Sequence, residues 1–262
     1  METMNITLAA AWQPRGELNR FLELLPQLQA AYQWISIALP PETEGEIVDR
    51  FQDLPQVSAD RTRDWSWGRF KALQGALQYP GSHVQYADFD RLLRWVETEP
   101  VEWQKIVSMI LEVDCLIIGR SDKAYQTHPQ ALIRTEAISN QVISHFLGME
   151  VDVSAGSKGF SREAAEYIVA NCEPGHALGT DAEWPIILKQ AGFQLSYITA
   201  DGLDWESADR YRDKAADQLS QREAAKNYDA DPENWAKRVG VSMEIIRMGI
   251  STIERGINPR ED

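Results

Sequence analysis

Two aspartates, Asp88 and Asp90, directly follow the apolar run 83–87 in the stretch SHVQYADFDRLL. The run predicts a buried strand, and residues two apart in an extended chain point the same way. Neighbouring carboxylates raise each other's pKa unless a cation lies beside them. The natural cation is Mg²⁺ or Mn²⁺, which usually also holds a substrate phosphate. Because a D-x-D motif is short, the alternative is a surface turn with two solvated aspartates.

A second acidic pair, Asp181 and Glu183, lies in the stretch GTDAEWP, where a helix is predicted to begin. In a ligand crevice, such a carboxylate can act as a general base. The alternative is structural: acidic residues in a first turn suit the helix dipole, and Asp181 can serve as an N-cap.

A glycine-containing stretch, SAGSKGFSRE at residues 154–163, combines small and basic residues. Gly156 and its neighbours would allow a backbone to approach a ligand closely, and Lys158 and Arg162 would offset phosphate charge. The alternative is a glycine turn that leads into a capped helix. The spacing does not match a phosphate-binding P-loop.

The elements that would position these side chains alternate along the first 120 residues. Apolar strand-like runs, at about residues 5–12, 33–40, 56–59, 83–88 and 114–119, are separated by amphipathic helical segments. This alternation predicts βαβ units and a mainly parallel sheet covered by helices on both faces. Open sheets of this kind bind ligands at the carboxyl ends of their strands, which is where Asp88 and Asp90 fall.

Later segments are less regular. Helices are predicted near 135–148, 161–171 and 181–191, with strand-like segments near 149–160 and 193–200. A charged helical region follows residue 204. We expect one domain over 1–204, with a boundary between its two halves after residue 120, and a helical extension over 205–262.

Composition limits the functional classes. The 262 residues are 44% hydrophobic and 25% charged, as in ordinary globular proteins, and the net charge of −14 argues against general nucleic-acid binding. No apolar run reaches the roughly 20 residues of a transmembrane helix, and no signal peptide is visible. Cys115 and Cys172 match no metal or disulfide pattern, so a cytoplasmic location is expected.

Taken in order, these motifs resemble family-2-type glycosyltransferases of the GT-A fold, and in particular the polyprenyl-phosphate sugar synthases. The resemblance extends from about residue 5 to 202. It rests on YADFD, DCLIIGR, VDVSAGSKGFSREAA and LGTDAEWPIILKQAGFQLSYI, of which the last two are the most specific. It implies a GT-A-like (Rossmann-like) sheet that binds a nucleotide-sugar donor, with residues 1–120 as the nucleotide-binding half and residues 121–204 as the acceptor half.

The resemblance also implies roles for individual residues. Asp90, with Asp88, would hold the metal that bridges the donor diphosphate, Asp88 would lie near the ribose or sugar, and Asp181 would deprotonate the acceptor. Independently of the resemblance, the small size of Gly156 and the charges of Lys158 and Arg162 predict that they line the acceptor side. The remaining nucleotide contacts would come from Trp12, Pro14, Glu42, Arg61 and Arg63.

The sequence departs from the family at the nucleotide contacts, where AWQPRGEL and PPET replace the usual segments. The prediction is a metal-assisted hexosyltransferase that uses Mg²⁺ or Mn²⁺ and inverts with Asp181 as base; a retaining transfer is the alternative outcome. Its acceptor would be a small molecule, a glycan or a polyprenyl phosphate. The alternatives are a nucleotide- or sugar-binding protein without catalysis, a nucleotidyltransferase and a scaffold.

Overall fold

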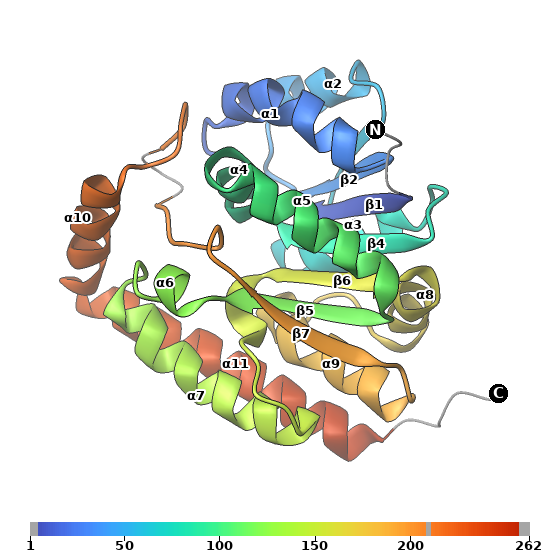
Figure 1. The fold of residues 1–262 in the computed structure, drawn as a ribbon, viewed down its shortest axis with the longest axis vertical. Coiled ribbons are helices and arrows are strands. Elements are labelled where there is room, and N and C mark those ends of the chain that lie inside the picture. The colour runs from blue at the N-terminus through green and yellow to red at the C-terminus, as the bar shows by residue number, and fades with distance from the viewer. Residues whose placement is uncertain (1–4, 208–210, 257–262) are drawn as a thin grey trace.

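The computed structural model describes residues 5–207 and 211–256, which form an α/β fold around one seven-stranded sheet (Figure 1). The strand order is β3-β2-β1-β4-β6-β5-β7, and only β6 runs antiparallel to its neighbours. The predicted mainly parallel sheet is therefore confirmed. The strands are β1 (Ile6–Ala11), β2 (Trp34–Leu39), β3 (Val57–Arg61), β4 (His83–Asp88), β5 (Cys115–Arg120), β6 (Ser157–Ser161) and β7 (Leu195–Ala200).

Helices connect and cover these strands. Among the described residues, none is long and apolar enough to cross a bilayer. The helices are α1 (Leu18–Ala31), α2 (Gly45–Gln52), α3 (Gly68–Ala76), α4 (Phe89–Thr98), α5 (Pro100–Met109), α6 (Asp122–Tyr125), α7 (Gln130–Leu147), α8 (Arg162–Asn171), α9 (Thr180–Gln190), α10 (Gln218–Asp229) and α11 (Pro232–Arg255), with short 3₁₀ helices η1 (Trp65–Trp67), η2 (Ile110–Glu112), η3 (Val153–Ala155) and η4 (Ala177–Gly179).

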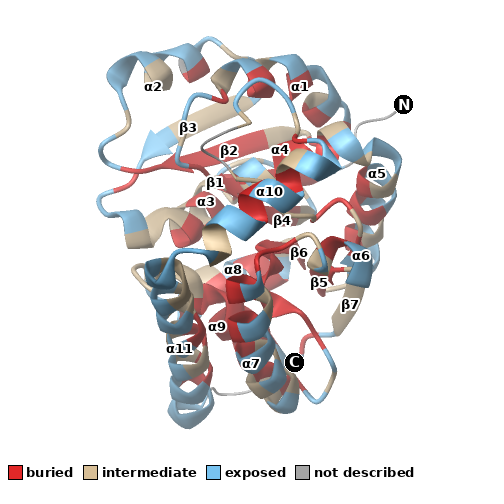
Figure 2. Cartoon of the chain, turned by 90° about the vertical axis from the view of Figure 1, so that its left-hand side faces the viewer, coloured by how far each residue is buried: buried red, intermediate tan, exposed pale blue. Residues whose placement is uncertain are grey.

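Successive side chains of a strand point to opposite faces of the sheet, and both faces are covered by helices. In β1, Ile6, Leu8 and Ala10 pack with α1, α4 and α5, whereas Ala9 packs on the other side with α3. Helices α8 and α9 join that second layer. Figure 2 shows buried central strands, a less buried strand β3 at one edge, and outer helix faces that are exposed. Burial of both sheet faces is what makes the strands read as nearly continuous apolar runs.

Contrary to the expectation from the sequence, the D-x-D motif is not extended over its whole length. Strand β4 ends at Asp88 and α4 begins at Phe89, so Asp90 lies in the first helical turn rather than in an extended segment. Pro100 separates α4 from α5, of which it is the first residue. Pro26 instead lies inside the continuous helix α1.

The C-terminal helices pack on the rest of the molecule. Helix α11 contacts α7, α9 and η4, and the Ser242 hydroxyl donates to the Thr135 carbonyl (2.8 Å). The segment after β7 is fastened by buried Arg94, whose guanidinium pairs with Asp204 (2.7 Å) and Glu206 (2.5 Å). Residues 208–210 and 257–262 of the predicted extension lie outside the described part of the chain.

Candidate functional site

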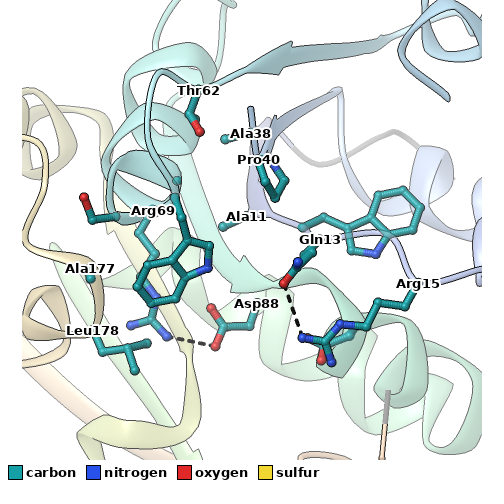
Figure 3. A pocket seen from close by; sticks show the side chains of 15 residues that line it. Ala11, Gln13, Arg15, Ala38, Pro40, Thr62, Arg69, Asp88, Ala177 and Leu178 are labelled. Atoms are coloured by element: carbon teal, nitrogen blue, oxygen red, sulfur yellow. Dashed lines mark hydrogen bonds and ion pairs between the residues drawn. The ribbon is translucent and has the colours of Figure 1, made fainter. Parts of the chain in front are cut away.

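The strand carboxyl ends meet at a hollow of about 250 Å³ (Figure 3). Arg69, Ala177 and Leu178 lie on one side of it, Gln13 and Arg15 lie on the other, and Asp88 lies between them. The hollow thus combines apolar surface with a few converging charges, as ligand sites do. Its lining comes from β1, β2, β4, α3, α4 and the loops around them: Ala11, Trp12, Gln13, Arg15, Ala38, Pro40, Thr62, Trp65, Ser66, Gly68, Arg69, Asp88, Asp90, Ala177 and Leu178.

Asp88 and Asp90 both line this hollow, as the sequence predicts. Asp88 accepts hydrogen bonds from the Tyr86 hydroxyl (2.6 Å) and from Arg69 Nη2 (2.9 Å). Asp90 is exposed, and its carboxylate accepts a hydrogen bond from the adjacent Arg91 N–H (2.9 Å). The surrounding protein and the charge of Asp88 raise the pKa of Asp90. Of the two carboxylates, Asp90 is therefore the less neutralised.

Asp181 lies near the same pair, one residue after the start of α9. Its buried carboxylate contacts Lys158 Nζ (2.7 Å) and Arg69 Nη1 (2.7 Å). Burial alone would raise the pKa of Asp181, but the charges of Arg69 and Lys158 outweigh it and lower the pKa below the ordinary value. Asp181 is consequently a buried anion held between two cations.

Arg69 links the two acidic sites and was not among the site residues predicted from the sequence. The guanidinium bridges Asp88 and Asp181, which are 93 residues apart in the chain. It is buried, and a planar guanidinium with several donors suits two carboxylates better than an ammonium would. The available signal was an arginine in the first turn of a helix that follows a strand. Its partners became apparent only in the fold.

The glycine-containing stretch is divided between the two ends of the sheet. Gly156 lies beside Asp88, whose N–H donates to the Gly156 carbonyl (2.8 Å). Lys158 points inward and also donates to the Val153 carbonyl (3.0 Å). Arg162 instead donates to the carbonyls of Leu77 (2.8 Å), Tyr79 (3.0 Å) and Gly81 (3.1 Å), at the amino end of β4.

The placement of Arg162 corrects the prediction that it lines the acceptor side. Strand β6 is antiparallel to β4, and its register pairs Ser161 with His83. Strand β6 therefore runs from Ser157, near the carboxyl end of β4, to Ser161, at its amino end. As a result, Gly156 lies at the site, whereas Arg162 lies at the opposite edge of the sheet. Sequence order alone did not reveal this reversal.

The five residues that were predicted to contact the nucleotide do not lie together in the structure. Trp12 lines the hollow, and its indole N–H donates a hydrogen bond to Glu17 Oε1 (2.8 Å). Pro14 and the exposed Glu42 are not among the described residues that line it. Arg61 and Arg63 line a different groove of about 460 Å³ beside α3. Of these five residues, the structure places only Trp12 in the wall of the hollow at the strand ends.

Two further hollows adjoin the first. One, of about 220 Å³, is lined by Asp88, Asp90, Asp181 and Arg69, among others, and places all three acids around one space. The other, of about 280 Å³, shares Asp90 and Arg15 with the first hollow. It also contains basic and aromatic side chains that include Arg91, His128, Tyr228 and Arg238.

Side chains of α9 and α11 stabilise η4, which forms one wall of the first hollow. Glu244 of α11 accepts hydrogen bonds from the backbone N–H groups of Leu178 (2.9 Å) and Gly179 (3.1 Å). Buried Glu183 binds His176 Nδ1 (2.8 Å), and this hydrogen bond raises the pKa of His176. Helices α9 and α11 thus position the η4 segment of the site, although this segment belongs to neither helix.

The site has the donor chemistry for a divalent cation only in part. Two carboxylates share one crevice, and a hard cation is often held by one or two carboxylates together with substrate phosphates. Within residues 5–207 and 211–256, no group of three or more His, Cys, Asp or Glu is arranged to hold a metal ion. Asp88 and Asp90 therefore fit a cation whose remaining ligands come from a substrate.

Comparison with known proteins relates the chain to others through its fold. No protein-family model and no curated protein sequence matches it. The mannosyl-3-phosphoglycerate synthase of Rubrobacter xylanophilus is similar in structure, with a TM-score of 0.58 and 12% identity, over 98% of this chain and 77% of that one. For the glucosyl-3-phosphoglycerate synthase of M. tuberculosis, the TM-score is 0.53 and the identity 14%, over 91% and 81%. The chain thus has a GT-A-type, Rossmann-like fold with C-terminal helices.

Proposed function

We propose that this protein transfers a sugar from a nucleotide-sugar donor to an acceptor. The observation that carries the proposal is the convergence of Asp88, Asp90, Arg69 and Asp181 on adjoining hollows at the strand carboxyl ends. The nucleotide would lie against Trp12, with its diphosphate near Asp88, Asp90 and Arg69. The GT-A-type fold supports this reading, since both similar structures bear the names of sugar-phosphoglycerate synthases.

In this proposal, Asp88 and Asp90 hold Mg²⁺ or Mn²⁺ together with the donor. When bound, the cation would neutralise charge on the leaving diphosphate. Arg69 would add a fixed positive charge that needs no rearrangement during the reaction. Gly156, which has no side chain, leaves room for Asp88 at the crevice floor.

Asp181 would act on the acceptor in an inverting transfer. Its lowered pKa makes it a weak base toward a free hydroxyl. It would therefore accept a hydrogen bond first, and the proton only as the new bond to the sugar makes the hydroxyl more acidic. Lys158 and Arg69 would hold the carboxylate in position throughout.

The acceptor would occupy the hollows next to Asp181 and Asp90. Arg91 and Arg238 line both of these spaces, which favours a small acceptor that carries an acidic group over a neutral glycan. A polyprenyl phosphate carries such a group too, but none of the features described here accounts for its lipid part. We also propose a reducing compartment such as the cytoplasm, because Cys115 and Cys172 are both free and buried.

The test is release of nucleoside diphosphate from a panel of nucleotide sugars, with Mn²⁺ or Mg²⁺ and a set of small phosphorylated and carboxylated acceptors. We expect turnover in the wild type and a loss of at least about 100-fold in kcat/KM for Asp90→Asn. Glu42→Gln is the matched control, because Glu42 is exposed and outside the lining of the hollow.

The same panel separates the alternatives. A raised melting temperature with a donor but no release in any reaction would indicate binding without catalysis. The absence of both would contradict the proposed function.

A further inference from the structure

Arg69 already occupies the position where a cation would act on Asp88. Its Nη2 lies 2.9 Å from Asp88 Oδ2, and the Tyr86 hydroxyl is 2.6 Å from the other carboxylate oxygen, Oδ1. Asp181 anchors the same guanidinium at 2.7 Å from Nη1. Both oxygens of Asp88 are therefore engaged before any ligand enters.

A divalent cation that enters alone would meet unfavourable conditions. Asp90 is the more open carboxylate, Asp88 is neutralised by a buried arginine, and the described residues supply no cluster of three ligands. The fixed guanidinium charge would also repel the cation across a partly buried crevice, where screening is weak.

A diphosphate reverses this balance. It brings oxygen ligands for the cation, and its negative charge attracts both the cation and Arg69. Arg69 lines the hollow with Trp12 as well as the hollow with Asp181, so its guanidinium faces the space where such a group would lie.

We propose that Arg69 makes cation and diphosphate bind together: it excludes a divalent cation from Asp88 and Asp90 until a diphosphate is present, and then contacts the diphosphate itself. This inference rests on the proposed function, because it places the donor diphosphate at this crevice. Arg69 thereby couples occupancy of the cation site to the arrival of the donor.

The experiment measures binding rather than transfer. The probes are Mn²⁺ alone, inorganic pyrophosphate alone and the preformed manganese–pyrophosphate complex. Binding is followed by tryptophan fluorescence, because Trp12 and Trp65 line the hollow, and free Mn²⁺ by electron paramagnetic resonance. For the wild type we expect the complex to bind at least tenfold more tightly than either component.

Two substitutions separate charge from shape. Arg69→Met removes the positive charge, so we expect Mn²⁺ alone to bind at least about tenfold more tightly and pyrophosphate alone at least tenfold more weakly. Arg69→Lys keeps the charge but cannot bridge both carboxylates, so Mn²⁺ alone should bind as weakly as in the wild type. The Tyr86→Phe control removes a hydrogen bond from Asp88 without changing the charge.

Several results would overturn the proposal. One is tight Mn²⁺ binding by the wild type without pyrophosphate, which needs no variant and so holds even if Arg69→Met fails to fold. Another is equal Mn²⁺ affinity in wild type and Arg69→Met. These outcomes differ from failure of the proposed function, which would appear as coupled binding in the wild type with no sugar transfer from any donor.

Discussion

At the scale of single residues, Asp181 combines a proposed chemical role with a structural one. Its carboxylate is the shared partner of Lys158 and Arg69, and all three side chains are buried. Removing one member of a buried ion pair leaves an uncompensated charge, which costs about 3–5 kcal/mol. A substitution at a catalytic base on an open surface would carry no such cost.

We therefore expect Asp181→Asn to lower the free energy of unfolding by about 3 kcal/mol and to abolish transfer. The double variant Asp181→Asn/Lys158→Met removes both members of one pair and should recover much of the lost stability. Urea unfolding of both variants measures this. If Asp181→Asn unfolds like the wild type, the ion pairs do not support the fold.

At the scale of elements, the turn into β6 sets the position of Asp88. Gly156 has φ of 73°, and a Cβ built on it would lie 2.3 Å from Asp88 Oδ2. A larger residue would be strained in this backbone conformation and would also displace the carboxylate. The close approach of β4 and β6 thus requires glycine here.

Gly156→Ala is expected to lower stability by about 1–3 kcal/mol and to weaken binding of the manganese–pyrophosphate complex. The control is Gly240→Ala in α11, where the added Cβ meets nothing within 4 Å. That change should raise stability by about 0.5–1 kcal/mol, since alanine favours a helix. Thermal unfolding distinguishes them, and equal effects would argue against a special role for Gly156.

The loop before α9 carries a pH-sensitive contact. The hydrogen bond to Glu183 raises the pKa of His176 above 6.5. A raised folded-state pKa means that the contact contributes fully below pH 6.5 and is lost as the pH rises through the folded pKa. We expect the wild type to lose stability relative to His176→Gln over that interval. Melting temperatures of both proteins from pH 5.5 to 8.5 measure this loss. If the two melting temperatures change with pH in parallel, the His176–Glu183 contact is not pH-sensitive.

At the scale of the whole molecule, the C-terminal helices complete the site. Helix α11 holds η4 through Glu244, although Glu244 follows Leu178 by 66 residues. Because Ala177 and Leu178 line the first hollow, a change in α11 should alter the affinity of a ligand that binds there.

Glu244→Ala leaves the Leu178 N–H without its Glu244 acceptor, whereas the Gly179 N–H keeps the His176 carbonyl (2.7 Å). We expect a loss of about 1–3 kcal/mol in stability and weaker binding of the manganese–pyrophosphate complex. Glu254→Ala serves as the control, since Glu254 is exposed on the same helix. The measurements are thermal unfolding and fluorescence titration, and unchanged affinity in Glu244→Ala would show that η4 does not depend on α11.

The sequence by itself determined the alternation of strands and helices and the location of Asp88 at a strand end. Both follow from local patterns: buried strands read as apolar runs, and the carboxyl ends of parallel strands share one edge. The position of Asp181 at the start of a helix was likewise readable from its local sequence.

Only the tertiary structure decided which charges meet. Arg69 lies 19 residues before Asp88 and 112 before Asp181. At such separations, no helix or strand repeat in the sequence indicates that the side chains meet. Strand β6 runs antiparallel, which keeps Gly156 at the site and carries Arg162 away from it. Long-range ion pairs and strand direction depend on how all the layers pack, so no local stretch of the chain contains them.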